Sequence, residues 1–301
     1  MFIVLEGVDG AGKSTLARAL SYRCNGEVRH FGAPKSHPLS EYGLLVEGYR
    51  PNERNVICDR FHIGEMIYAE LYRNGSLLGD AGYWWMQQLL RSRGALVVHV
   101  TAPLPLIEAR LERRGETFLR PEHVRRVHEE FAQRTADALT VTSPVDEVDL
   151  AEILVLARVH EWIVTPLTPF PHYVGPILPR LLLVGDTPNQ DNTKYPLHST
   201  VFAPYPGSSG RYLIEQVVLP STDPNAIGLV NAYHHNDTPI NLAGLWSALG
   251  QPEVVALGRK AEHLLSLLEV PHRAVPHPQY VRRFHYHEAG EYREDILAGL
   301  S

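Results

Sequence analysis

The first fifteen residues, MFIVLEGVDGAGKST, decide the fold of the N-terminal half of the chain. Residues 7–14 match the pattern Gly-x-x-x-x-Gly-Lys-Ser at every fixed position. Residues 1–6 form an apolar run that predicts a buried strand, and residues 13–24 carry apolar side chains at helical spacing. A glycine-rich loop between a strand and a helix turns backbone N–H groups and the positive end of the helix dipole toward phosphate oxygens. The stretch therefore predicts a P-loop that binds a nucleoside triphosphate.

The side chains of this loop have separate expected tasks. Lys13 reaches the β- and γ-phosphates, and the Ser14 hydroxyl ligates Mg²⁺. ATP and Mg²⁺ are therefore the expected cofactors. The residues expected to contact them are Gly7, Asp9, Gly10, Gly12, Lys13, Ser14 and Thr15.

Further strands and helices alternate along the chain, which predicts a parallel sheet covered on both faces. Strand patterns recur at 55–58 and 96–100, and helical patterns lie at 63–73, 80–93, 104–114, 121–139 and 149–163. Residues 164–179 contain five prolines and no charge, so they are the expected linker. Beyond it, strands are expected at 180–185, 227–231 and 253–257, with helices at 209–218, 241–249 and 258–268. The fold class is therefore α/β in two domains, 1–163 and 180–301.

The composition limits the partners of the chain. The formal net charge is -6, with 19 Lys and Arg against 22 Asp and Glu in residues 1–163, and 9 against 12 in residues 180–301. Neither half is a basic nucleic-acid surface, so any DNA contact must be local. No apolar run is long enough for a membrane span. The two cysteines, Cys24 and Cys58, and a first strand with no signal peptide before it favour a reduced, cytoplasmic protein.

Asp59 and Arg60 follow the predicted strand at 55–58, at the end where open parallel sheets bind ligands. The arginine fork suits an acceptor phosphate. The carboxylate suits Mg²⁺ or the orientation of an attacking oxygen. A structural salt bridge is the alternative interpretation of this pair.

The strings FIVLEGVDGAGKST at 2–15 and DRFH at 59–62 resemble the corresponding motifs of thymidylate kinases and their phage relatives. The resemblance implies that Asp9 lies near the acceptor sugar, although a loop-capping role is the alternative. It also implies that Glu65 and Tyr68 flank the pocket of the acceptor base, unless they only pack their helix. A homodimer is a further expectation by resemblance.

Residues 101–116 resemble the strand end, helix and arginine-rich lid of the same family. Arg110 and Arg114 are four residues apart and therefore share a helix face. As lid arginines they would stabilise the charge that develops during phosphoryl transfer, although a solvated basic face is the alternative. The sequence departs from the family pattern in two ways, one that bears on the metal site and one that bears on the identity of the acceptor. The strand at 96–100 lacks the aspartate often found at its end, and the domain is shorter than typical thymidylate kinases.

Three stretches of the second half, 183–189, 228–231 and 275–279, resemble motifs of the uracil-DNA glycosylase superfamily in their order. The resemblance implies that Asn231 reads the edge of a flipped base and that His277 stabilises the leaving base. Thr187 stands where the classical family has its water-activating aspartate, and Asp186 precedes it by one residue. This departure indicates glycosylase chemistry that is retargeted or lost, and leaves open whether the domain cleaves a base. The alternative interpretation of Asn231 is a strand-end cap, and that of His277 is a turn residue. A pocket with these residues could also bind a free nucleotide without cutting it. Residues 282–284, Arg-Arg-Phe, are a DNA-phosphate and wedge element or a surface turn.

Three hypotheses follow. The first is a kinase for a deoxynucleoside monophosphate, fused to a glycosylase-like base-recognition domain, an arrangement typical of bacteriophage nucleotide metabolism. The second is a kinase that acts on a modified base in DNA, resembling phage hydroxymethyluracil-DNA kinases. The negative charge of both halves weighs against it, because DNA affinity depends on phosphate neutralisation. The third is a glycosylase or base-binding module with a nucleotide-driven switch.

Overall fold

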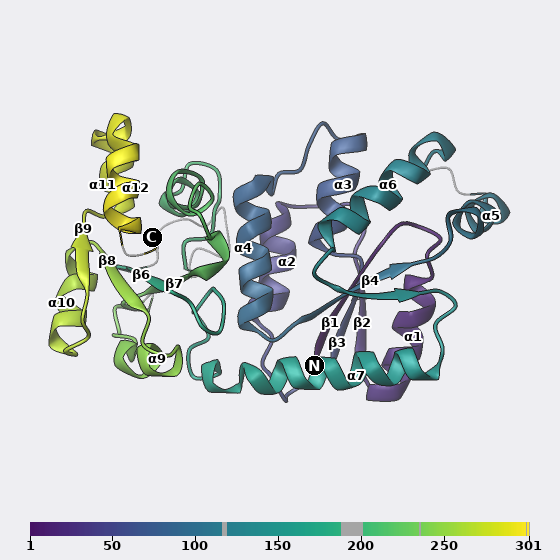
Figure 1. Ribbon diagram of the computed structural model, residues 1–301, viewed down its shortest axis with the longest axis horizontal. Coiled ribbons are helices and arrows are strands. Elements are labelled where there is room, and N and C mark those ends of the chain that lie inside the picture. Colours follow the sequence, from purple (N-terminus) through teal and green to yellow (C-terminus); the bar gives the residue numbers. More distant parts are fainter. Residues whose placement is uncertain (116–118, 188–200, 235, 299, 301) are drawn as a thin grey trace. The chain divides into compact units, whose positions relative to one another are not determined.

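The computed structural model describes residues 1–115, 119–187, 201–234, 236–298 and 300. The chain forms two compact units, each built around its own parallel sheet (Figure 1). Unit 1 comprises Met1–Pro38, Tyr49–Leu77 and Arg93–Thr165, and unit 2 comprises Leu39–Gly48, Leu78–Ser92 and Pro166–Ser301. Both sheets confirm the mixed α/β prediction.

The sheet of unit 1 has five parallel strands in the order β2-β3-β1-β4-β5. Their bounds are β1 Phe2–Glu6, β2 Glu27–His30, β3 Val56–Asp59, β4 Leu96–Thr101 and β5 Leu139–Thr142. The chain leaves the central strand β1 toward β2 and β3, and later crosses to β4 and β5 on the other side. Such a switch of direction opens a crevice at the carboxyl ends of the strands, where open α/β sheets bind ligands.

Helices cover both faces of this sheet. The helix α1 (Lys13–Cys24) contacts α7 (Glu147–Ile163), and α3 (His62–Tyr72) contacts α6 (Pro121–Arg134) across the sheet from them (Figure 1). The helix α5 (Leu104–Arg114) follows β4. All residues of β1 and β3 are buried, which explains why both strands are apolar runs.

Two elements of unit 1 depart from the sequence prediction. The helix predicted at 121–139 ends at Arg134, and Leu139–Thr142 instead forms β5 beside β4. The strand β2 was not predicted, because all four of its residues are exposed and show no apolar pattern.

The sheet of unit 2 has four parallel strands in the order β7-β6-β8-β9. The strands are β6 Leu181–Gly185, β7 Ile227–Asn231, β8 Glu253–Leu257 and β9 Arg273–Val275. The helices that follow them are α8 Ser209–Leu213, α9 Leu242–Ala248, α10 Arg259–Leu267, α11 Pro278–Phe284 and α12 Ala289–Leu297, and Ile214–Val218 forms a π-helical turn. None of the helices among the described residues is long and apolar enough to span a membrane.

Two helices that precede residue 163 in the sequence belong to unit 2 by their contacts. They are α2 (Pro38–Glu47), except for its first residue, and α4 (Gly79–Ser92). Trp85 on α4 is fully buried, and its Nε1 donates a hydrogen bond to the carbonyl of Val201 at 3.0 Å. Gln88 binds Asn225 at 2.8 Å. Both tryptophans of α4, Trp84 and Trp85, are therefore core residues of unit 2.

The proline-rich stretch at 164–179 is packed rather than loose. Val174 forms an antiparallel bridge with Leu229 of the edge strand β7, with N–O distances of 3.0 and 2.8 Å. Tyr173 and Val174 are fully buried. The apolar residues between the prolines explain this packing, which the proline count did not predict.

Candidate active site

The P-loop joins β1 to α1 at the crevice of unit 1. Gly7 has a φ of 147°, and a Cβ at this position would lie 2.1 Å from the carbonyl oxygen of Val100. Gly12 has a φ of 110°, and a Cβ there would lie 2.8 Å from the Ser143 hydroxyl. Only glycine fits both positions, because other residues would clash and rarely adopt these angles. The two glycines of the motif thus let the loop close over the strand ends.

Lys13 is folded back onto the loop and is 5% exposed. Its Nζ donates to the carbonyls of Gly7 and Val8 at 2.6 and 2.9 Å, and lies 3.6 Å from the Asp9 carboxylate. Burial lowers the pKa of the Lys13 ammonium, while the charge of Asp9 acts in the opposite direction. The ammonium is therefore held by two loop carbonyls, with which phosphate oxygens would compete for it.

Ser14 and Asp59 meet at the start of α1. The Ser14 hydroxyl donates to Oδ2 of Asp59 at 2.6 Å, and Nδ1 of His30 lies 3.1 Å from the same oxygen. Oδ1 of Asp59 is buried and has no hydrogen-bond partner among the described residues. The sequence predicted Ser14 and Asp59 as metal ligands but gave no signal for His30.

Asp9, Arg60 and Tyr68 form a second polar cluster. Nη2 of Arg60 binds Oδ1 of Asp9 at 2.6 Å, and the Asp9 backbone N–H donates to the Tyr68 hydroxyl at 3.3 Å. Arg60 has a φ of 68°, an uncommon left-handed conformation for a residue with a side chain. Burial raises the pKa of Tyr68 well above its usual value, so the phenol stays protonated.

Two buried glutamates near this cluster make hydrogen bonds or ion pairs at the two ends of the helix α3. Glu65, a predicted acceptor contact, is buried, pairs with Arg73 and accepts from Ser76 at 3.1 Å. Glu6 accepts from the N–H groups of Ile63 and Gly64 at 2.8 and 3.2 Å, at the start of α3. Burial raises the pKa of Glu6 to about 7. Glu6 directly precedes the P-loop in the sequence, but its contact with α3 is a tertiary feature that no local pattern indicates.

The two predicted lid arginines line one pocket of about 330 Å³ beside the P-loop. Arg110 donates to the Gly10 carbonyl at 2.9 Å and to the Ser143 hydroxyl at 3.2 Å, whereas Arg114 is exposed. The other lining residues are Gly10, Gly12, Thr15, Leu16, Ala19, Arg113, Ser143, Pro144, Val145 and Leu150. Residues 143–145, which follow β5, had no sequence signal. Glu116, the end of the predicted lid, lies outside the described residues.

The three predicted residues of unit 2 all lie at the carboxyl edge of its sheet, after β6, at the end of β7 and after β9. Oδ1 of Asp186 accepts from the backbone N–H of Ala261 at 2.8 Å, in the first turn of α10. Asn231 is 4% exposed. Nδ1 of His277 accepts from the Gln279 backbone N–H at 3.1 Å and caps α11. Neutral His277 therefore carries its proton on Nε2.

The surroundings of these residues add an aromatic ring that the sequence did not indicate. A Cβ on Gly185 would lie 2.4 Å from Cζ of Phe202 and 2.7 Å from Oδ1 of Asn231, so both side chains approach Gly185 closely. Burial lowers the pKa of His277, which the Asp186 charge partly offsets. Pro188 and Asn189 of the first motif lie outside the described residues.

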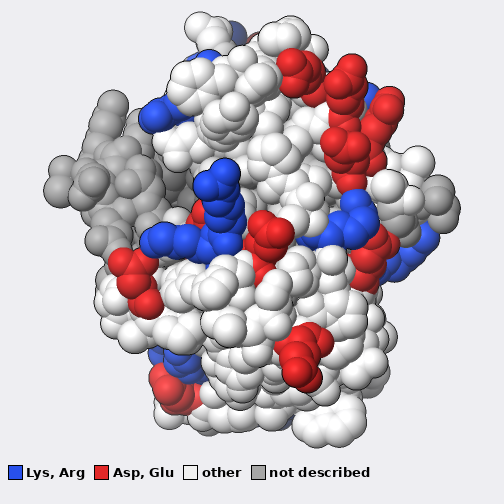
Figure 2. Space-filling model, turned by 90° about the vertical axis from the view of Figure 1, so that its left-hand side faces the viewer, with Lys and Arg blue, Asp and Glu red and all other residues white. Residues whose placement is uncertain are grey.

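The predicted DNA element at 282–284 is partly structural. Arg282 donates to the Gly207 carbonyl, while Phe284 is 65% exposed and its ring centroid lies 5.3 Å from that of Tyr280. Figure 2 shows a face on which Lys and Arg side chains lie among Asp and Glu side chains, with no continuous basic patch among the described residues on that face. This mixed charge matches the balance found in the sequence.

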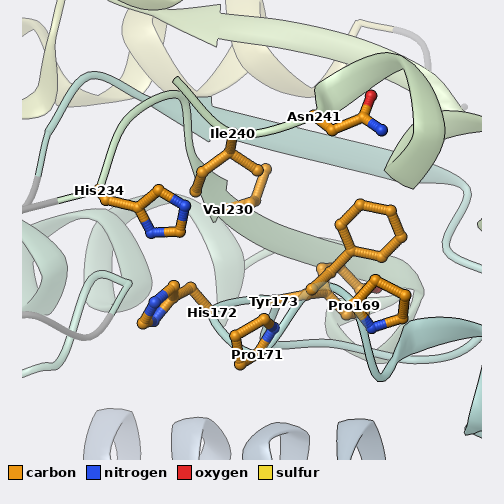
Figure 3. A pocket seen from close by; sticks show the side chains of 9 residues that line it. Pro169, Pro171, His172, Tyr173, Val230, His234, Ile240 and Asn241 are labelled. Carbon is orange, nitrogen blue, oxygen red and sulfur yellow. The ribbon is translucent and has the colours of Figure 1, made fainter. Parts of the chain in front are cut away.

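A separate pocket of about 260 Å³ lies beside β7 (Figure 3). His172 and His234 face each other at one end, with ring centroids 5.1 Å apart in an edge-to-face arrangement. Its lining comprises Pro169, Phe170, Pro171, His172, Tyr173, Val230, His234, Ile240 and Asn241. Successive strand residues point to opposite faces, so Val230 in this pocket and Asn231 at the other site lie on opposite sides of β7.

Comparisons with known proteins find similarity over about half of the chain. No protein-family profile matches it. The SPbeta prophage-derived protein YorR of Bacillus subtilis (strain 168) is 27% identical over 140 residues, which cover 45% of this chain and 82% of YorR. The crystal structure of YorR in complex with phosphorylated GDP aligns with a TM-score of 0.45 and 23% identity, over 54% of this chain and 98% of that chain. Deoxyadenosine kinase from M. mycoides with bound dCTP aligns with a TM-score of 0.33 and 17% identity, over 52% and 97%.

Proposed function

We propose that unit 1 transfers the γ-phosphoryl group of ATP to a deoxynucleoside monophosphate. The observation that carries the proposal is the meeting of Ser14 and Asp59 at 2.6 Å, at the start of the helix that follows the P-loop. A P-loop supplies the triphosphate site, and a carboxylate from the neighbouring strand end supplies the group that such a site needs for its cation. The Arg60 guanidinium, next in the chain, is then placed for an acceptor.

The donor nucleotide has a defined place in this proposal. The loop N–H groups and Lys13 hold its phosphates. The pocket of about 330 Å³ beside α1 offers apolar side chains, Leu16, Ala19 and Leu150, for the base. Arg110 connects Gly10 of the loop to Ser143, which lies next to Gly12, and so stiffens the site around the phosphates.

The residues present fit Mg²⁺. The Ser14 hydroxyl donates its proton to Asp59, which leaves its lone pairs for a cation, and Oδ1 of Asp59 is a buried oxygen without a partner among the described residues. The described residues hold no group of three acidic, histidine or cysteine side chains for a metal, so phosphates and water would complete the shell. Bound Mg²⁺ neutralises charge on the phosphate oxygens.

The acceptor site of the proposal is the Asp9, Arg60 and Tyr68 cluster. The Arg60 fork binds the acceptor phosphate, and Asp9, its ion-pair partner, lies beside the acceptor sugar. Arg110 and Arg114 stabilise the charge on the transferred group. The alternative acceptor is a hydroxymethyl base in DNA, and the excess of 22 Asp and Glu over 19 Lys and Arg in residues 1–163 weighs against it.

An ADP-release assay with Mg-ATP tests this proposal. The acceptor panel contains the four deoxynucleoside monophosphates, thymidine and hydroxymethyluracil-containing DNA, and chromatography identifies the product. We expect a diphosphate from one monophosphate, and no transfer by Lys13→Ala. Phosphoryl transfer to the DNA, with no transfer to any monophosphate, would support the alternative acceptor. Transfer by Lys13→Ala at the wild-type rate would refute the P-loop assignment.

For unit 2 we propose recognition of a nucleobase. The convergence of Asp186, Asn231 and His277 at one sheet edge supports it, because a buried amide and an Nε2–H donor can read the polar edge of a base. Equilibrium binding of uracil-containing single-stranded DNA and of free nucleotides, compared with Asn231→Ala, tests recognition. Release of free base, measured separately, decides whether the site also cleaves.

A mass near 33.8 kDa in light scattering would exclude the homodimer.

A further inference from the structure

The carboxylate of Asp59 is bonded asymmetrically. Oδ2 receives two contacts, from the Ser14 hydroxyl at 2.6 Å and from Nδ1 of His30 at 3.1 Å. Oδ1 is buried and receives none among the described residues. A buried charged oxygen without a partner is costly, so this arrangement indicates a place for a ligand on the Oδ1 side.

His30 is placed by the sheet and not by the core. It is the last residue of β2, directly opposite Asp59 in the register of β2 and β3. The backbone N–H of the next residue, Phe31, donates to the Asp59 carbonyl at 3.0 Å, which anchors the strand end. The His30 side chain is 56% exposed, so packing does not explain its orientation. The contact between Nδ1 of His30 and Oδ2 of Asp59 explains this orientation.

We infer that His30 is a positioning residue for the cation of the phosphoryl-transfer site. This inference rests on the proposed function. Two donors on Oδ2, from different elements, fix the rotation of the carboxylate about its last torsion angle. That rotation directs Oδ1 toward the cation that Ser14 shares. Without His30, Ser14 alone holds Oδ2, and the carboxylate can turn away from the position that binds the cation.

Residues that do not touch a metal themselves often hold its ligands in place. Groups that hydrogen-bond to ligating carboxylates orient them, and removing such a partner typically lowers metal affinity by about 10–100-fold. A carboxylate oxygen only accepts hydrogen bonds, so Nδ1 of the imidazole is the donor in this contact. An asparagine side chain can present an N–H donor in a similar position and is therefore the conservative replacement.

The experiment measures Mn²⁺ binding to the full-length protein in the presence of a non-hydrolysable ATP analogue, by the enhanced water-proton relaxation of protein-bound Mn²⁺. The variants are His30→Ala, His30→Asn and Ser14→Ala, with His160→Ala on α7 as the matched control. Binding of the analogue alone is measured in EDTA. We expect His30→Ala to weaken Mn²⁺ binding by about tenfold or more. We expect His30→Asn to restore most of it, His160→Ala to match wild type, and the metal-free affinity to stay unchanged.

The possible failures are distinguishable. If wild type binds Mn²⁺, Ser14→Ala does not, and His30→Ala matches wild type, then the inference about His30 is wrong and the cation site stands. If His30→Asn is as weak as His30→Ala, the donor role is also wrong. If wild type binds no Mn²⁺ with the analogue, the proposed function itself fails.

Discussion

The hydroxyl of Ser14 donates a hydrogen bond to Oδ2 of Asp59, 45 residues away in the sequence, at 2.6 Å. This contact joins the start of α1 to the end of β3, and so connects the phosphate loop to the strand end that carries Arg60. The two halves of the proposed reaction, donor and acceptor, therefore meet at one pair of side chains. The second oxygen of the same carboxylate, Oδ1, is buried and has no hydrogen-bond partner in the described part of the chain.

Replacing Asp59 by asparagine should lower kcat by at least about tenfold, because it removes the negative charge that faces the cation while keeping the side-chain shape. Steady-state kinetics at several Mg²⁺ concentrations measure the effect, and higher Mg²⁺ should recover part of the loss. Wild-type kcat at low Mg²⁺ would show that Asp59 is not a ligand. Asp137→Asn, on the segment between α6 and β5, is the control for a generic loss of acidic charge.

Replacing Arg60 by alanine should raise the KM for the acceptor while the KM for ATP stays near its wild-type value. The guanidinium is 31% exposed and its known partner is Asp9, so an acceptor phosphate can reach it. Arg60→Lys should recover little, because a lysine lacks the planar fork that binds two phosphate oxygens. An unchanged acceptor KM in Arg60→Ala would place acceptor binding elsewhere.

The strands buried over most of their length were predictable from sequence, and the contacts that complete the sites were not. β1, β3 and β6 are apolar because every one of their residues is buried, so pattern alone finds them. β9 has three residues that are exposed or half-buried, and it carries no such signal. The helices α11 and α12 were also missed, being short and partly exposed.

The same distinction holds within the candidate sites. The P-loop is local, since its glycines and Lys13 lie within eight residues, and a motif describes it fully. The contacts of His30 and Ser143 depend on which strands become neighbours. That order, with β2 beside β3 and β5 beside β4, is a property of the folded sheet. Glu65 was expected to flank the acceptor base by resemblance or only to pack its helix, and its carboxylate pairs with Arg73.

Asp186 offers a test of capping in unit 2. Its Oδ1 accepts from the Ala261 N–H, one of the unpaired donors in the first turn of α10. Asp186→Ala should therefore destabilise unit 2 by about 1 kcal/mol, the usual cost of losing a helix cap. Asp186→Asn keeps the acceptor oxygen and should lose much less. Thermal unfolding followed by tryptophan fluorescence measures both, and equal losses would contradict the capping role.

Glu6 and His99 are register partners on the adjacent strands β1 and β4, and burial shifts their pKa values in opposite directions. It raises the pKa of Glu6 from 4.5 to about 7, and lowers that of His99 from 6.5 to about 4. The unfolded chain ionises Glu6 first as the pH rises, so its contribution to stability is lost between pH 4.5 and 7. The unfolded chain protonates His99 first as the pH falls, so that contribution is lost between pH 6.5 and 4. Each amounts to about 3 kcal/mol.

The two contributions oppose each other between pH 4.5 and 6.5, so the stability of unit 1 in the wild type should change little there. Glu6→Gln leaves the His99 contribution, and stability should then rise with pH over this range. His99→Gln leaves the Glu6 contribution, and stability should then fall. Hydrogen exchange of the β1 amides, corrected for intrinsic rates, measures the opening free energy of unit 1 alone. Parallel pH profiles for all three proteins would mean that neither group is shifted by its burial.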